Sequence, residues 1–189
     1  MALEQAQEES WVSASRRGDV LAFNRLVLKW EKTIYNVAFR MLQDREEAAD
    51  ATQEVFLHAY KGIRRFRQDS KFSTWLYRIA LNHCVTRVKQ RPAGVHVSLD
   101  DEDAVERPTE QLAVSESQAG ELLRREQRRR LLAALSHLQA EQQAIIELKF
   151  FQEMTFEEIA QVLDIPLSTI KSRLYAGLET LKIRLGGKD

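Results

Sequence analysis

Apolar residues recur at helical spacing along almost the whole chain, and this periodicity constrains the fold more than any other feature. The clearest set advances in steps of one, three and four residues from Phe23 to Met41, which describes one side of a helix of about six turns. No segment alternates apolar and polar residues for long, as a half-buried strand would. Only 7 glycines and 3 prolines interrupt the 189 residues. The sequence therefore predicts an all-α fold.

Capping residues predict where several helices begin. Asp44 is followed three places later by Glu47, and Thr155 by Glu158, which is the spacing of a capping box. The first pair predicts a helix from Arg45 to about Lys61, and the second pair predicts a short helix near the C-terminus.

Charge is distributed unevenly, although 28 basic residues balance 28 acidic ones. Residues 16–91 contain 16 basic and 8 acidic residues, residues 92–121 contain 1 and 8, and residues 122–189 contain 11 and 9. The middle segment also holds two of the three prolines and little that could form a core. We therefore expect two small helical domains, residues 10–91 and 122–186, joined by a flexible acidic linker at residues 92–121.

A basic and aromatic segment runs from Lys61 to Arg91. It contains nine basic residues and one acidic residue, Asp69. Basic side chains neutralise phosphates, and exposed aromatic rings stack on unpaired bases, so the segment suits binding of an opened strand. The alternative is a core helix with buried aromatic rings and a solvated basic side. Residues 64–71 are polar and predict a loop, after which Ser73 is expected to cap the next helix. The aromatic residues are Phe66, Phe72, Trp75 and Tyr77.

The helix before this segment has two unlike sides. One side is apolar, and the other side carries acidic groups together with Phe56 and Leu57. A purely solvated side rarely carries large apolar groups, so a protein-binding surface is favoured over burial on both sides.

The C-terminal part of the chain contains a helix-turn-helix pattern, preceded by predicted helices at 122–138 and 140–151. A short helix is broken at 164–166, where Pro166 suits the first turn of the next helix. Ile170 and Leu174 anchor that helix, so its polar residues are free to contact a major groove. An ordinary helical hairpin is the alternative. The candidate base-contacting residues are Ser168, Thr169, Lys171, Ser172, Arg173 and Tyr175.

Other classes of site and location are disfavoured. The single cysteine, Cys84, allows no internal disulfide, and its apolar neighbours favour a buried thiol over a redox-sensitive one. His83 has no further ligands at zinc spacing, so we expect no metal and no cofactor. No apolar run approaches the roughly 20 residues of a membrane span, and no signal-peptide pattern begins the sequence. We expect a cytoplasmic protein without membrane insertion.

An enzyme is the least favoured class. Five acidic residues near one helix start resemble a metal-binding cluster, but no Gly-rich phosphate loop, His–acid pair or nucleophile motif accompanies them. The preference of acidic groups for helix N-termini is the simpler account. We therefore expect no catalytic residue and no small-molecule substrate. The five residues are Asp44, Glu46, Glu47, Asp50 and Glu54.

Three motifs in order resemble the extracytoplasmic-function (group 4) members of the sigma-70 family, which are bacterial RNA polymerase specificity subunits. DATQEVFLHAY at 50–60 resembles the family's core-polymerase-binding helix. FRQDSKFSTWLYRIALN at 66–82 resembles its promoter-opening segment. MTFEEIAQVLDIPLSTIKSRL at 154–174 resembles its upstream-element reader. The resemblance covers about residues 10–185 and implies sigma regions 2 and 4 as the two domains.

The resemblance also implies roles for particular residues. Core polymerase would be bound by Asp50, Gln53, Glu54, Phe56, Leu57 and Tyr60. The −10 strand, including a flipped base, would be bound by Arg64, Arg65, Arg67, Ser70, Lys71, Phe72, Trp75, Tyr77, Arg78 and Asn82. The helix-turn-helix residues would read the −35 element, the acidic linker would occupy the polymerase cleft, and an anti-sigma factor would regulate the chain.

Two departures from the family pattern stand out. Many relatives carry a basic residue near Ala176-Gly177, where this chain has none, so one expected DNA contact is in doubt. Asp164 replaces the glycine common at helix-turn-helix turns. The main alternative function is a stand-alone regulator that uses only the helix-turn-helix, which would leave the 50–60 surface and the basic segment without a role.

Overall fold

The computed structural model describes residues 2–91 and 118–186. These residues form eight α-helices and two short helical segments, with no strand among them, which confirms the all-α prediction. The expected linker lies almost entirely outside the described residues. Within the described ranges, no helix is both long and apolar enough to span a bilayer.

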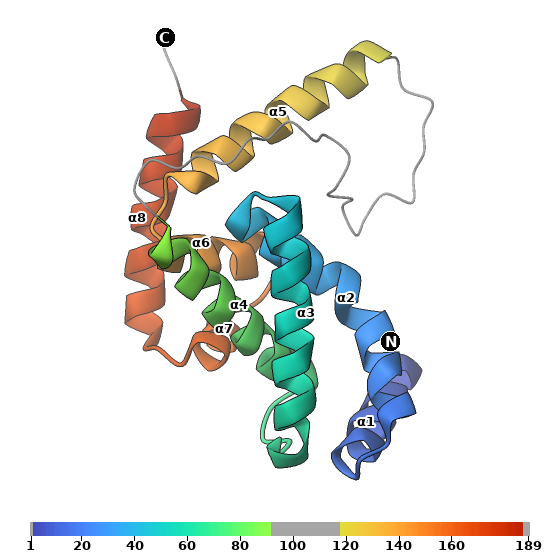
Figure 1. The fold of residues 1–189 in the computed structure, drawn as a ribbon. Helices are drawn as coiled ribbons and strands as arrows, with labels where there is room; N and C mark the ends of the chain where they lie inside the picture. The colour runs from blue at the N-terminus through green and yellow to red at the C-terminus, as the bar shows by residue number, and fades with distance from the viewer. Residues whose placement is uncertain (1, 92–117, 187–189) are drawn as a thin grey trace.

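The N-terminal domain is built on an antiparallel pair of long helices, α2 and α3, against which the other helices pack (Figure 1). The Asp19 carboxylate accepts from the Ala22 amide at 3.0 Å and begins α2. The Asp44 carboxylate accepts from Glu47 N–H at 2.8 Å and begins α3, as predicted. The elements are α1 (Ala2–Arg16), α2 (Val20–Leu42), α3 (Arg45–Gly62), the 3-10 turn η1 (Ile63–Arg65) and α4 (Phe72–Gln90).

The start of α4 differs from the prediction. Ser73 was expected to cap this helix, but α4 begins at Phe72, and its N-cap residue Lys71 makes no side-chain cap. The Phe72 ring is buried and lies 6.2 Å from Phe66 and 5.8 Å from Trp75 between ring centroids. Burial of this aromatic cluster, rather than a hydroxyl cap, therefore fixes where α4 begins.

The C-terminal domain contains two long helices, α5 and α8, and three shorter elements between them. Helix α5 begins at Gln118, earlier than the expected Leu122, and the helix expected over 140–151 turns into a π-helical segment at Glu147. The Thr155–Glu158 capping box is present, with hydrogen bonds of 3.2 and 3.0 Å. The elements are α5 (Gln118–Ser136), α6 (Ala140–Ile146), the π-helix η2 (Glu147–Phe151), α7 (Phe156–Leu163) and α8 (Leu167–Leu185).

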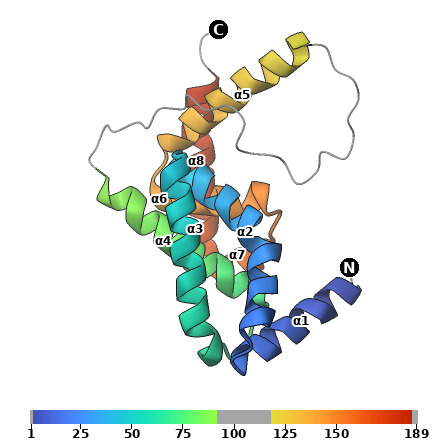
Figure 2. The same cartoon turned by 45° about the vertical axis from the view of Figure 1, so that its right-hand side comes forward.

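The two domains pack closely against each other. Helix α4 contacts α2 and α3 of the N-terminal domain and α6 and α7 of the C-terminal domain, and it lies between α3 and α7 in Figure 1. One cluster of buried apolar side chains includes residues of both domains. Helix α5 projects away from this body (Figure 2). The faces of α4 are therefore shared between the two domains.

Candidate nucleic-acid and protein-binding surfaces

The outer side of α3 combines acidic and apolar groups at the surface. Asp50 and Gln53 are exposed, and Leu57 and Tyr60 keep 44% and 45% of their surface accessible. Glu54 is partly exposed and lies 4.0 Å from His58. A carboxylate row beside two large apolar groups suits a protein partner with basic and apolar groups.

Phe56 does not belong to this surface. The expectation that its ring is exposed is wrong, because only 8% of the residue is accessible and it belongs to the core cluster. The neighbouring core positions on α3 include Ala48, Ala51 and Ala59, which are small. A large ring at the edge of a stripe of small residues can reach the core, which helical spacing alone does not reveal.

The 3-10 turn η1 and the loop that follows it present basic groups outward. Arg64, Arg65 and Arg67 are exposed. Between them, Phe66 turns inward and stacks on Trp75 with a centroid distance of 4.9 Å. Gln68 has a left-handed backbone with φ of 63°, and its carbonyl oxygen Oε1 accepts from Arg16 of α1 at 3.0 Å. The loop is therefore held between α1 and an aromatic base, with its charges facing solvent.

The aromatic residues of this segment are less accessible than predicted. Phe72 and Tyr77 are each only 5% exposed, so the expectation of accessible rings is wrong for both, and the alternative of buried aromatic residues holds there. Trp75 is partly exposed, Ser70 is partly exposed, and Asn82 is exposed. In this structure, basic and polar groups together with Trp75 thus form the accessible part of the surface.

Three of the predicted strand-binding residues contact the C-terminal domain. The Tyr77 hydroxyl donates to Gln152 Oε1 at 2.5 Å, and burial, reinforced by the Glu147 charge, raises the pKa of this phenol. Arg78 donates from Nε to the Val162 carbonyl at 3.0 Å and from Nη2 to the Gln161 carbonyl. Lys71 lies 3.7 Å from the Glu158 carboxylate.

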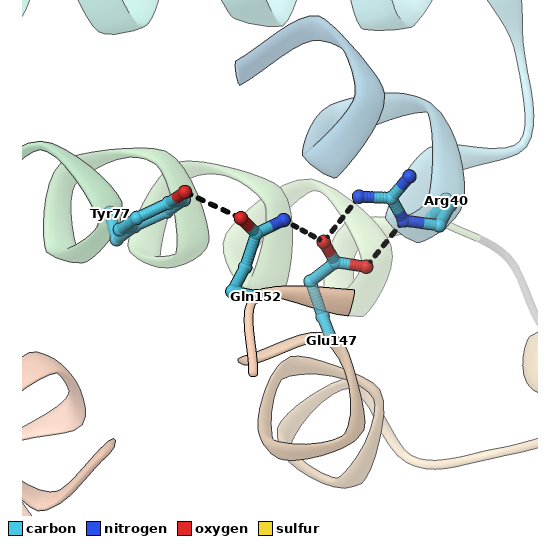
Figure 3. Close-up of polar contacts among 4 residues, drawn as sticks. All are labelled: Arg40, Tyr77, Glu147 and Gln152. Carbon is cyan, nitrogen blue, oxygen red and sulfur yellow. Dashed lines mark hydrogen bonds and ion pairs between the residues drawn. The ribbon is translucent and has the colours of Figure 1, made fainter. Parts of the chain in front are cut away.

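A buried ion pair that was not predicted from the sequence joins the domains beside this site (Figure 3). Arg40 Nε and Nη2 each donate to one oxygen of the Glu147 carboxylate at 2.6 Å. The two residues are 8% and 2% exposed. Glu147 also accepts from Gln152 Nε2 at 3.0 Å, so the network continues to Tyr77. The only signal in the sequence is a charged residue inside an apolar run at each position, and it does not identify the partner.

The helix-turn-helix of α7 and α8 presents the predicted residues to solvent. Ile170 and Leu174 are buried, and the polar residues around them are exposed or partly exposed, with Tyr175 at 64%. Asp164 adopts the left-handed conformation at the turn, with φ of 56°, as a glycine would. The residues placed on this surface are Ser168, Thr169, Lys171, Ser172, Arg173 and Tyr175.

Gly177 faces α6 rather than the DNA-binding side. A Cβ at this position would lie 3.1 Å from Ile146 Cδ1 and 3.4 Å from Gln142 Cβ. A long side chain at Gly177 would have to displace α6, whereas the neighbouring Ala176 is exposed. Close helix packing explains the glycine.

Neither a metal site nor a reactive thiol is found in the part of the chain that the structure describes. No group of three or more potential ligands is arranged to hold a metal ion among residues 2–91 and 118–186. Cys84 is fully buried, and burial raises the pKa of its thiol to about 12.

Comparisons with known proteins cover nearly the whole chain. Residues 26–92 match the family model for sigma-70 region 2, and residues 128–181 match that for sigma-70 region 4. The RNA polymerase sigma-H factor of Pseudomonas aeruginosa is 34% identical over 95% of this chain and 94% of its own length. The ECF RNA polymerase sigma factor SigW of Bacillus subtilis is 31% identical over 90% of this chain and 92% of its own.

Solved structures show the same fold at low sequence identity. CnrH, in a complex with the cytosolic domain of CnrY, superimposes with a TM-score of 0.68 at 20% identity, covering 97% of this chain and 99% of CnrH. The sigma factor RpoE of Bartonella quintana, in a complex with the anti-sigma factor NepR, gives 0.63 at 19% identity, covering 90% and 100%.

Proposed function

The chain belongs to the sigma-70 family as a sigma factor of the extracytoplasmic-function type, and we propose that it directs core RNA polymerase to a two-part promoter. The observation that carries the proposal is the order of the surfaces on one chain. An acidic and apolar α3 surface, a basic loop and a solvent-facing helix-turn-helix follow one another within the matched regions.

Each surface has the chemistry that its proposed partner needs. The α3 surface binds core polymerase through carboxylates beside apolar groups. Its residues are Asp50, Gln53, Glu54, Leu57 and Tyr60. The arginines of the 64–71 loop neutralise phosphates of the −10 strand, and Asn82 offers an amide for base recognition. The N-terminal turns of α8 enter a major groove at the −35 element through Lys171, Arg173 and their neighbours.

Regulation and location are part of the same proposal. A relative of the same fold, RpoE of Bartonella quintana, was solved with an anti-sigma factor, and we infer that an anti-sigma factor also controls this chain. We infer a cytoplasmic location, where polymerase and promoter DNA are present. The chain acts by binding and does no covalent chemistry of its own.

Co-purification with bacterial core RNA polymerase, followed by run-off transcription from a promoter library, tests the proposal. We expect association with core and a common two-part promoter among the transcribed sequences. Asp50→Ala and Leu57→Ala should each weaken association by about tenfold, as central interface residues do. Leu185→Ala removes a leucine side chain of similar exposure, 48% against 44% for Leu57, from the end of α8 and serves as the matched control. Failure to bind core, together with autonomous binding to duplex DNA, would instead identify a stand-alone regulator.

A further inference from the structure

The end of α1 lies beside the basic loop of residues 64–71. Arg16, in the last turn of α1, donates from Nη1 to Gln68 Oε1 at 3.0 Å. The guanidinium end of Arg64 approaches Gly18, in the turn between α1 and α2, where a Cβ would lie 3.3 Å from Arg64 Nη2. One short stretch of chain therefore contacts the loop both at its start and beyond its middle.

Helix α1 is itself fixed to the core of the N-terminal domain. Val12 is 2% exposed and belongs to the core cluster, and Trp11 packs against that cluster. Helix α1 contacts both α2 and η1. The match to sigma-70 region 2 begins at residue 26, so α1 lies outside it. A helix anchored in this way gives the loop a fixed support.

The conformation of the loop depends on such support. Gln68 has φ of 63°, which side chains other than glycine rarely adopt and which persists where the surrounding contacts enforce it. The Phe66 ring on Trp75 fixes the first half of the loop, and the Arg16 hydrogen bond holds Gln68 in the second half. The Nε atom of Arg16 is buried, so this side chain is enclosed by protein and its guanidinium is directed at the loop.

We propose that Arg16 is a positioning residue for recognition of the −10 strand, because through Gln68 it fixes the backbone of the 64–71 loop and thereby sets which bases the loop prefers. The inference rests on the proposed function for what the loop binds. Discrimination between bases requires polar groups held in one geometry, since a mobile group can bond to several bases almost equally well. Arg16 acts through the loop, so its loss should change base preference more than the total amount of transcript.

Backbone order parameters from ¹⁵N relaxation of the free chain test the contact without polymerase. In the unchanged chain we expect values of about 0.85 for residues 67–69, as in rigid backbone. Arg16→Met keeps an apolar stem and removes the donor. It should lower these values to below about 0.6, the range of flexible backbone, while residues 74–80 of α4 keep theirs.

Further variants separate this contact from general damage to α1. Arg17→Met is the matched control, because Arg17 is exposed and donates within α1 to Ser13 Oγ at 2.8 Å, and it should leave the loop rigid. Gln68→Met removes the acceptor and should reproduce Arg16→Met. The double variant R16M/Q68M should be no more flexible than either single variant, because all three lose the same contact. Gln68→Glu keeps an acceptor at the same length and should keep the loop rigid.

Run-off transcription with core polymerase, from a promoter library randomised across the −10 element, measures the consequence for recognition. The ratio of transcripts from the preferred base to those from the next base defines the preference at each position. Arg16→Met should reduce the largest of these ratios by about fivefold, the effect of about one hydrogen bond. Arg17→Met should leave every ratio unchanged. Both variants should associate with core as the unchanged chain does, because neither changes the α3 surface.

Three results would contradict the proposal at different steps. Unchanged order parameters in Arg16→Met, or additive effects of the Arg16→Met and Gln68→Met changes, would overturn the contact as the support of the loop. A flexible loop with an unchanged base preference would overturn the positioning role. Failure of the unchanged chain to bind core would overturn the proposed function, while the order parameters would still test the contact, so the two failures are distinguishable.

Discussion

On α8, the residues proposed to read the −35 element project into solvent from a helix anchored inside its own domain, whereas on α4 the residues proposed to grip the −10 strand point partly into the other domain. Tyr175 is 64% exposed and Tyr77 is 5% exposed. Both segments are basic helices with tyrosines in family motifs. The contrast shows that accessibility of a binding motif is a property of the domain arrangement and not of the motif.

The largest expected effect compares a buried and an exposed position of α8, Gly177 and Ala176, by their effect on stability. Gly177→Lys should lower the free energy of unfolding by about 2–4 kcal/mol, because its side chain would enter the contact with Ile146 and Gln142. Ala176→Lys, one residue earlier at an exposed position, should change stability by less than about 0.5 kcal/mol. Urea denaturation measures both. Equal stability of the two variants would contradict the packing explanation for Gly177.

The next effect concerns a basic residue on each helix. Arg78→Ala should weaken the docking of the C-terminal domain by about 1–2 kcal/mol, because two α7 carbonyls lose a charged donor. Lys171→Ala on the exposed α8 surface should leave docking unchanged. Calorimetry measures the thermal unfolding of both variants. We expect separate unfolding transitions for the two domains in Arg78→Ala and not in Lys171→Ala. A single, unshifted transition in both variants would remove Arg78 from the docking contact.

A smaller effect compares the two tyrosine hydroxyls. Tyr77→Phe should cost about 1 kcal/mol, since Gln152 loses a hydrogen-bond partner in a buried network. Tyr175→Phe should cost less than about 0.5 kcal/mol, because the exposed hydroxyl is replaced at a solvent-facing position. The urea midpoints of the two variants give the comparison. A larger loss of stability in Tyr175→Phe than in Tyr77→Phe would contradict a buried Tyr77–Gln152 hydrogen bond.

The smallest effect concerns two helix ends with the same backbone conformation. Asp164 and Gln43 end α7 and α2 with φ of 56° and 54°. Asp164→Gly should stabilise the chain by up to about 1 kcal/mol, because glycine adopts this conformation without strain. Gln43→Gly should instead destabilise it by about 1 kcal/mol, because the Gln43 amide donates to the Leu132 carbonyl at 2.6 Å across the domains. Thermal unfolding distinguishes the two signs, and stabilisation by both changes would show that the Gln43 contact contributes little.

The helices themselves were predictable because their determinants are local. The Asp44 and Thr155 caps, the apolar stripe of α2 and the break before α8 all depend on residues within a few positions of one another. The predicted Ser73 cap of α4 was wrong, because α4 begins one residue earlier at Phe72, whose ring packs in an aromatic cluster. The helix-turn-helix surface was predictable for the same reason, since Ile170 and Leu174 fix which sides of α8 remain free.

The strand-binding and polymerase-binding surfaces were only partly predictable. Leu57 and Phe56 are adjacent on α3, and the sequence gives both as large apolar residues beside acids, yet one ring is in the core and the other side chain is at the surface. Which one turns inward depends on how α3 meets its neighbours. Burial of Tyr77 likewise depends on a domain that follows more than 40 residues later in the chain.

The sequence by itself determined the all-α fold, the starts of α3 and α7 and the order of three motifs that identify the family, because periodicity, capping and motif identity act over short distances. Only the tertiary structure decided that Arg40 meets Glu147, 107 residues away, and that the two domains share the sides of α4. A buried charge requires a partner, and the sequence shows the requirement without showing where the chain brings that partner.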